Sequence, residues 1–155
     1  MTDLSDLLRH DAVLKDVPAA TKKILFQHLA ATAASLFGVD AREVADRLAA
    51  REKLGSTGFG GGVAIPHAKL AGIPAVTGMV VRLAQGIEFG AVDELPVDLV
   101  FLLLSPLDAG ADHLKALARV SRRLRNRTFL AKLRGAASPD AIYALFTEDT
   151  VRDAA

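Results

Sequence analysis

His67 is the residue whose type and setting carry the most chemistry, because it follows a proline at the end of the glycine-rich stretch Gly60 to Lys69. An imidazole is nucleophilic near neutral pH, and its phosphoramidate bond is reactive enough to pass a phosphoryl group onward. Pro66 has a fixed φ and no N–H, and it favours extended geometry at Ile65, so His67 should leave the preceding strand in a defined direction. From spacing alone, a phosphoryl carrier and a histidine that merely caps a loop are equally good explanations.

A phosphorylated histidine needs neighbours that accept an anion, and the residues before it supply them. Five of the eight residues from Gly55 to Gly62 are glycine, too many for a helix or a strand, which predicts a loop. Exposed N–H groups of such a loop bind phosphate, and positive side chains add to the attraction. The residues expected around the phosphoryl group are Arg51 and the phosphate-binding set Ser56, Thr57 and Gly58.

His113 is the second histidine with an expected role. It follows Asp112 at the predicted start of a helix, where the positive end of the dipole favours a neutral imidazole. Because this helix follows the apolar strand Leu99 to Leu104, its first turn should open at the strand's carboxyl end, where ligand crevices of α/β sheets lie. We expect His113 to meet His67 there, orienting it or donating a hydrogen bond to a phosphoryl oxygen. Taken alone, His113 is better explained as a polar residue at a helix start.

Helical periodicity marks the elements that must carry these residues. After the turn signal at residues 16–18, apolar residues recur at helical spacing from Ile24 to Leu36. A second helix is expected from Asp40, an N-cap with Glu43 three residues later, to about Gly55, which puts Arg51 in its last turn. Two further helices are expected from Asp112 to Leu124 and from residue 138 onward.

Short apolar runs between these helices predict the strands. Strands are expected over 63–65, 78–83 and 99–104, and the last should be central because it is apolar on both faces. Helices at both ends with strands between them predict an α/β fold, a mixed sheet flanked by helices on both faces, in a single domain over residues 1–155. Its 155 residues, 51% of them hydrophobic, suit one core.

Composition excludes several classes of function. The net charge is only +1, so the chain should not bind nucleic acid. It has no cysteine, which fits a reducing compartment, and the cytoplasm is the expected location. Residues 1–10 do not form a secretory signal, and the longest large-apolar run, 99–104, is far below the roughly 20 residues that span a bilayer, so no membrane insertion is expected.

The other motifs considered give no competing site. No histidine is spaced at i, i+3 or i, i+4 from another, so no metal is expected, and His10 and His28 receive no role. The glycine loop lacks the dinucleotide and P-loop patterns, and Ser56 lacks the frame of a hydrolase nucleophile. A basic run is interpreted first as a solvated helix face, and otherwise as a docking surface for an acidic partner; it comprises Lys115, Arg119, Arg122, Arg123, Arg125 and Arg127.

The stretches 51–58 and 62–69 closely resemble the mannitol/fructose class of phosphotransferase-system enzyme IIA. The match continues through 89–93, 96–101 and 113–124, which resemble the nitrogen-regulatory branch of that class, so it covers nearly the whole chain. The run Gly60 to Gly62 departs slightly, since it is richer in glycine than the usual loop of this branch.

The resemblance implies a phosphocarrier without a cofactor. His67 would accept a phosphoryl group from a histidine-containing phosphocarrier protein, His113 would assist, and Arg51 matches the family's active-site arginine. Regulated target proteins are the other implied partners. Two alternatives stay open: a sugar-specific enzyme IIA that passes phosphate to an enzyme IIB, and a regulator that binds an anion or metabolite non-covalently without phosphorylation of His67.

Overall fold

Strand β6 (Val97–Pro106) is the centre of a six-stranded mixed sheet in the computed structural model, which describes residues 4–147. Strand β5 (Thr77–Ile87) pairs with it antiparallel on one side, while β3 (Val63–Ala64) and β4 (His67–Leu70) pair with it parallel on the other. The remaining strands extend the sheet at its two sides, β1 (Leu8–Val17) beside β5 and β2 (Gly58–Gly60) beside β3. The central position predicted for 99–104 is confirmed.

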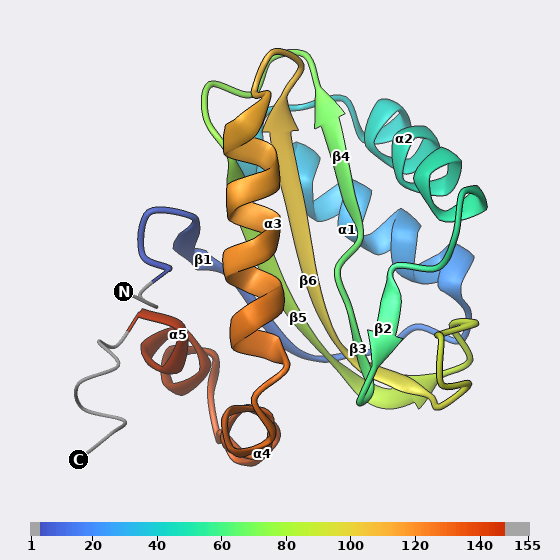
Figure 1. Cartoon of the computed structure of the whole chain (residues 1–155), viewed down its shortest axis with the longest axis vertical. Coiled ribbons are helices and arrows are strands. Elements are labelled where there is room, and N and C mark those ends of the chain that lie inside the picture. The colour runs from blue at the N-terminus through green and yellow to red at the C-terminus, as the bar shows by residue number, and fades with distance from the viewer. Residues whose placement is uncertain (1–3, 148–155) are drawn as a thin grey trace.

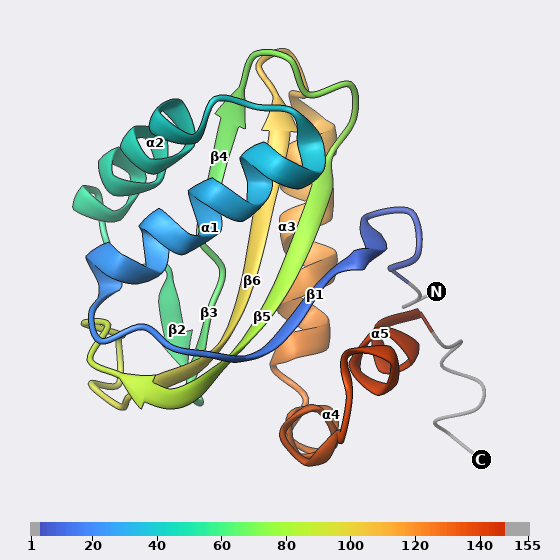
Figure 2. The same ribbon diagram turned by 180° about the vertical axis from the view of Figure 1, so that it is seen from behind.

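Helices cover both faces of this sheet, as Figures 1 and 2 show from opposite sides. Helix α1 (Lys22–Phe37) crosses one face, with α2 (Ala41–Lys53) packed beside it and against β4. Helix α3 (Ala111–Leu124) lies on the opposite face, followed by α4 (Arg127–Gly135) and α5 (Pro139–Thr147). The predicted α/β class is confirmed; residues 1–3 and 148–155 of the predicted domain lie outside the described residues.

Local capping sets the helix boundaries. The Thr21 side chain accepts from the N–H of Ile24 at the start of α1, and Gly38 ends that helix with φ of 71°, a left-handed conformation that glycine adopts without strain. Asp40 caps α2 as predicted, accepting from the N–H of Arg42. Arg51 therefore lies in the last turn of α2, facing the loop that precedes His67.

Four elements differ from the sequence prediction, and one of them is β4, which begins at His67 where a strand was expected to have ended. Strand β1 was not expected, because it is an edge strand with two register irregularities and its buried positions do not alternate. Helix α4 was also missed. The stretch 55–62 was expected to hold no strand, yet Gly58–Gly60 pairs antiparallel with β3 and forms β2. Glycine is required at position 58 because a Cβ there would lie 2.9 Å from the Cβ of Ala91.

The predicted basic face of the third helix is not simply solvated. The Arg119 guanidinium binds both carboxylate oxygens of Asp6 at 2.8 Å. The Arg123 guanidinium lies 4.1 Å from the ring centroid of Phe129 and donates to the carbonyl of Leu145. These two arginines fix the N-terminal segment and the last helices onto α3, and Arg127 belongs to α4 rather than to this helix.

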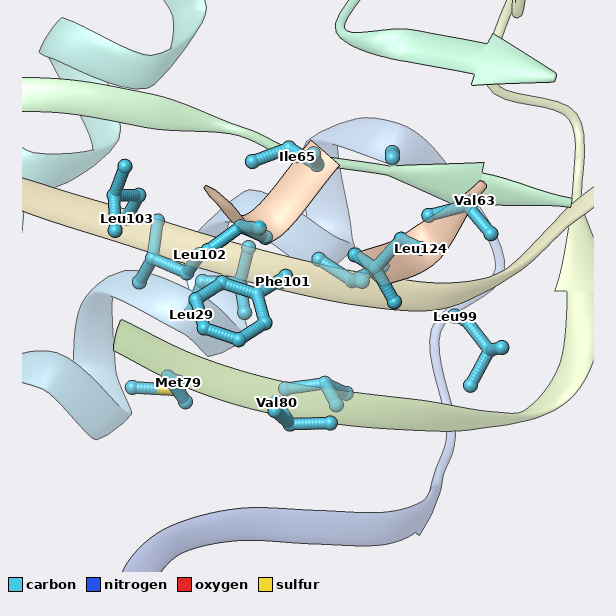
Figure 3. Close-up of a cluster of buried hydrophobic side chains, with 14 of the residues drawn as sticks. Leu29, Val63, Ile65, Met79, Val80, Leu99, Phe101, Leu102, Leu103 and Leu124 are labelled. Atoms are coloured by element: carbon cyan, nitrogen blue, oxygen red, sulfur yellow. The ribbon is translucent and has the colours of Figure 1, made fainter. Parts of the chain in front are cut away.

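The core lies between the central strands and the helices, and Figure 3 shows part of it around β5 and β6. Every residue from Leu99 to Leu104 is buried. Phe101 packs edge-to-face on Phe146 of α5, which packs in turn on Phe129 of α4. Burial on both faces of β6 makes it a rigid support for whatever its neighbours β3 and β4 carry.

Gly78 of β5 is a position at which a single methyl group should weaken this core. A Cβ there would lie 2.5 Å from Cε1 of Phe101, whose ring is held by Phe146 and cannot move away cheaply. We expect Gly78→Ala to lower the free energy of unfolding by about 1–3 kcal/mol, measured by urea titration. Gly135→Ala, at the open end of α4 with no atom within 4 Å, is the matched control and should be neutral or slightly stabilising. Equal stabilities of the two variants would refute the overpacking argument.

Candidate active site

His67 is positioned by a break between two short strands that both pair with β6. Strand β3 stops at Ala64, and β4 begins at His67 in register with Leu103. Between them, Ile65 donates its N–H to the carbonyl of Thr57, and the carbonyl of Pro66 accepts from the N–H of Leu103. The sequence predicted that His67 leaves a strand end, whereas the strand resumes at His67 itself. The break turns the backbone while both ends stay fixed to the rigid central strand.

The two ring nitrogens of His67 have different partners. Nδ1 lies 2.8 Å from the carbonyl oxygen of Ile65, which can only accept, so this nitrogen carries the proton. Nε2 lies 3.1 Å from Nε of Arg51, which can only donate, so this nitrogen presents its lone pair. Arg51 also donates to the carbonyl of Gly55 at 2.9 Å, which steadies the guanidinium beside the ring. The neutral tautomer is therefore fixed with Nε2 as the nucleophilic atom.

The electrostatic surroundings keep this ring neutral. Burial lowers the pKa of His67 below its ordinary value of 6.5, and the positive charge of Arg51 lowers it further. The hydrogen bond to Ile65 and the charge of Glu52 act in the opposite direction without reversing the shift. A neutral imidazole at neutral pH keeps the Nε2 lone pair available for attack on an electrophile.

His113 lies against His67, as the sequence predicted. The two ring centroids are 5.6 Å apart, and only 7% of His113 is exposed. Burial lowers its pKa, as do electrostatic interactions with the His67 ring and the Lys69 ammonium. Nδ1 of His113 lies 2.6 Å from the hydroxyl of Ser105, a fully buried residue of β6 that sequence reasoning missed. The available signal was a single polar side chain directly after six apolar ones.

The predicted phosphate-binding residues belong to a loop that is anchored on Glu52. Both carboxylate oxygens of Glu52 lie 3.2 Å from the N–H of Thr57, and the Thr57 hydroxyl donates to one of them at 2.7 Å. The N–H of Gly58 donates to the Ser56 hydroxyl. Burial raises the pKa of Glu52, but hydrogen bonds from Thr57, Lys22 and Ser56 outweigh it, so the pKa falls below its usual value. Sequence reasoning missed Glu52, although it directly follows Arg51.

The run of glycines has its own partners, away from the two histidines. The N–H of Gly61 donates to Asp93, and the carbonyl of Gly61 accepts from Arg134 of α4, which also pairs with Asp98 at 2.8 Å. Three of the five glycines predicted to form an anion-binding loop therefore shape the β2–β3 turn and its contact with α4. The structure brings together His67, His113 and Arg51, with residues 56–58 held next to Arg51 through Glu52.

The lowered pKa values give the site a pH signature. Unfolded histidines take up protons near pH 6.5, while the folded rings of His67 and His113 resist protonation. Below about pH 6.5 the unfolded state therefore binds more protons than the folded state. The two neutral histidines contribute their full stabilisation of the folded state above that pH, and this stabilisation is lost as the pH falls below it. Urea titrations at about pH 7 and about pH 5 should show a drop in the free energy of unfolding that is smaller in His67→Asn. His28→Asn, an exposed control, should keep the full drop; an unchanged drop in His67→Asn would contradict this assignment.

The fold and this site define an α/β protein with a neutral, nucleophilic histidine held against an arginine and a second histidine. The chain belongs to the family described as phosphoenolpyruvate-dependent sugar phosphotransferase system, EIIA 2, whose model matches residues 6–149. It is thus a phosphotransfer component. This membership confirms the family resemblance that the sequence showed in residues 51–69 and 113–124.

Individual relatives point to one branch of this family. A nitrogen regulatory protein of Bradyrhizobium diazoefficiens is 48% identical over 142 residues, which cover 92% of this chain and 93% of the relative. A PTS system fructose-specific EIIA component of Haloferax volcanii is 35% identical, with 96% and 97% covered. The crystal structure of nitrogen regulatory protein IIA-Ntr from Neisseria meningitidis matches with a TM-score of 0.86 at 33% identity, over 92% of this chain and 97% of that chain.

Residues 4–147 contain neither a candidate membrane-spanning helix nor a candidate metal-binding cluster. No helix there is both long and apolar enough to cross a membrane. Within the same residues, no three or more histidine, aspartate or glutamate side chains are grouped so that they could hold a metal ion.

Proposed function

We propose that this protein is a phosphocarrier of a nitrogen-type phosphotransferase system, which accepts a phosphoryl group on Nε2 of His67 from a histidine-containing phosphocarrier protein. The observation that carries the proposal is the pair of contacts on the His67 ring: Nδ1–H is held by Ile65, and the Nε2 lone pair faces the Arg51 guanidinium. An in-line attack on an incoming phosphoryl group needs this unprotonated Nε2, from which Arg51 must withdraw as the group arrives.

The transfer step balances without an external base. The Nε2 lone pair forms the new N–P bond as the N–P bond of the donor histidine breaks, and the bonding electrons return to the donor imidazole. Nδ1 of His67 keeps its proton throughout, so the phosphorylated ring is stabilised by the carbonyl of Ile65. Arg51 turns from Nε2 to the equatorial phosphoryl oxygens and offsets their charge.

His113 and the Glu52-anchored loop complete the proposed site. If the Ser105 hydroxyl donates to Nδ1 of His113, Nε2–H of that ring is free to donate to a phosphoryl oxygen. Ser56, Thr57 and Gly58 remain the proposed phosphate-binding residues, and the Glu52 carboxylate fixes their loop beside Arg51. Contacts from these residues to a phosphoryl group would replace present ones, because the Thr57 hydroxyl now donates to Glu52 of α2 and the Gly58 N–H to the Ser56 hydroxyl.

A protein donor suits the surroundings of the site better than a small metabolite does. Leu54, three residues after Arg51, is 83% exposed, and Leu114, directly after His113, is 66% exposed. Large exposed apolar side chains beside charged and polar groups are typical of protein interfaces. This observation favours a docking phosphocarrier protein over the alternative of a non-covalent metabolite regulator.

Regulation of target proteins by phosphorylation state, in the cytoplasm, is the proposed output. The similarity to nitrogen regulatory proteins reaches 48% identity, against 35% for the fructose-specific relative, which favours the nitrogen-type branch over the sugar-specific alternative. A phosphoryl group adds about −1.5 to −2 charge beside exposed leucines, and such a change alters which partners bind a surface.

A phosphoenolpyruvate-driven phosphohistidine relay tests this function. The chain incubated with the relay is expected to gain acid-labile, base-stable phosphate, detected by intact-mass measurement and by radiolabel. Adding an enzyme IIB and its sugar should yield no sugar phosphate. Absence of label on folded protein would refute the phosphocarrier assignment, and efficient sugar phosphorylation would favour the sugar-specific alternative.

A further inference from the structure

An open surface cavity of about 610 Å³ lies between α1 and α2. Figure 2 shows the N-terminal half of α1 beside the C-terminal half of α2, the parts that line it. Its apolar wall comprises Phe26, Ala45 and Ala49, and its charged rim includes Lys22, Lys23 and Lys53. The volume falls within the range of pockets that bind small molecules.

Two of the three lysines that line this cavity lie where the helix dipole disfavours a positive charge. Lys22 and Lys23 occupy the first turn of α1, which contains no acidic residue, although a helix N-terminus is positive and favours anions. Lys53 adds a third positive charge from the last turn of α2. A site at which the sequence departs from local electrostatic preference is more often functional than accidental.

The acidic residues of the lining do not neutralise all three lysines. Glu52 pairs with Lys22 at 2.9 Å, and its oxygens also accept hydrogen bonds from Thr57. Most of its capacity to accept hydrogen bonds and to pair with a further cation is therefore used. Asp46 is two helical turns away from Lys53, about 10 Å along the axis. Within residues 4–147, neither Lys23 nor Lys53 has a carboxylate at ion-pair distance.

We infer that this cavity binds a small organic anion, a carboxylate or phosphate ester with an apolar body. The anionic group would lie at the ammonium groups of Lys22, Lys23 and Lys53, and the apolar body against Phe26, Ala45 and Ala49. The three ammonium groups come from the first turn of α1 and the last turn of α2, and the apolar side chains lie one to two turns farther along these helices, where Gln27 and Asp46 also line the site.

The cavity is linked to the active site through Glu52. An anion that attracts Lys22 weakens the Lys22–Glu52 pair, and Glu52 is the acceptor that fixes Thr57 of the loop beside Arg51. Any effect on phosphoryl transfer rests on the proposed function, whereas binding itself and the response of Thr57 do not.

Two probes of equal size separate the anionic and apolar contributions. 2-Naphthoate carries a carboxylate on an apolar body, and 2-naphthalenemethanol replaces that carboxylate with a neutral alcohol. In titrations followed by ¹H–¹⁵N NMR, we expect naphthoate to shift the amide signals of Lys23, Phe26, Ala49 and Thr57, and to bind about 10-fold more tightly than the alcohol.

Matched variants locate the site. The double variant Lys23→Met/Lys53→Met should weaken naphthoate binding about 10-fold, while the exposed Lys132→Met on α4 should leave it unchanged. Ala49→Leu, which fills the apolar wall, should abolish binding of both probes. Equal affinity for both probes, an unchanged affinity in the double variant, or shifts confined to other elements would overturn the proposal. None of these measurements uses phosphorylated protein, so they fail or succeed independently of the His67 chemistry.

Discussion

Replacing His67 with glutamine is expected to reduce phosphoryl acceptance to background. Glutamine has a similar size and can still accept from Arg51, but its amide has no nucleophilic nitrogen lone pair, so no N–P bond can form. The position of the Ile65 carbonyl and the pairing of residue 67 with Leu103 should be unchanged, because the backbone pairing does not depend on the imidazole. The measurement is label incorporation from the phosphohistidine relay, with the thermal midpoint recorded on the same preparation.

The other histidines provide the controls for this experiment. His113→Gln should retain the label but acquire and release it more slowly, because it assists without receiving the group. His10→Gln should behave like the parent protein, since His10 pairs with Asp140 on an exposed part of the surface. Label that persists in His67→Gln and disappears in His113→Gln would mean that the roles of the two rings are reversed.

Replacing Arg51 with alanine is expected to slow phosphoryl acceptance by about 10²- to 10³-fold. The guanidinium is the cation that touches Nε2 of His67, and a phosphoryl group arriving there loses its main source of charge stabilisation. Arg51→Lys should recover only part of the rate, because a single ammonium cannot contact Gly55 and the phosphoryl oxygens in the geometry of a guanidinium fork. Single-turnover rates of transfer from the phosphorylated donor measure this effect.

Arg47 is the matched control for Arg51. It lies one turn earlier on α2, and about half of its side chain is exposed. Its guanidinium lies 4.0 Å from the carboxylate of Glu43. Arg47→Ala should change the transfer rate less than about twofold, because exposed pairs of this kind contribute little. Equal rates in Arg47→Ala and Arg51→Ala would refute a direct role for the Arg51 guanidinium.

Much of the fold could be predicted because its signals are local. Asp40 caps α2 through its own side chain, and the six-residue apolar run 99–104 is buried on both faces and central. Strand β1 and the glycine strand β2 could not be predicted in this way. Strand β1 is defined by its pairing with β5, which is distant in the sequence. Strand β2 pairs with the adjacent β3, but its glycines are atypical of a strand, and the packing of Ala91 against Gly58 that favours glycine there is a distant contact.

In the candidate site too, the residues with local sequence signals could be predicted and those defined by tertiary contacts could not. Pro66 before His67, and Arg51 at the end of a helix, are visible in the sequence, since each depends on adjacent residues. Glu52 and Ser105 were missed because a carboxylate on a helix and a serine after an apolar strand are common. Only their contacts with Thr57 and His113 give them a role.

The sequence by itself singled out His67 as the proposed phosphoryl carrier, because an imidazole is nucleophilic, Pro66 fixes its local backbone and the surrounding residues resemble a known family. The tertiary structure decided which nitrogen of that imidazole is available. The proton lies on Nδ1 because the Ile65 carbonyl is there to accept it, and Nε2 is left facing Arg51 because α2 packs against β4. Tautomer and orientation depend on partners that meet only when the helix and the strand are packed together, so no pattern along the chain could specify them.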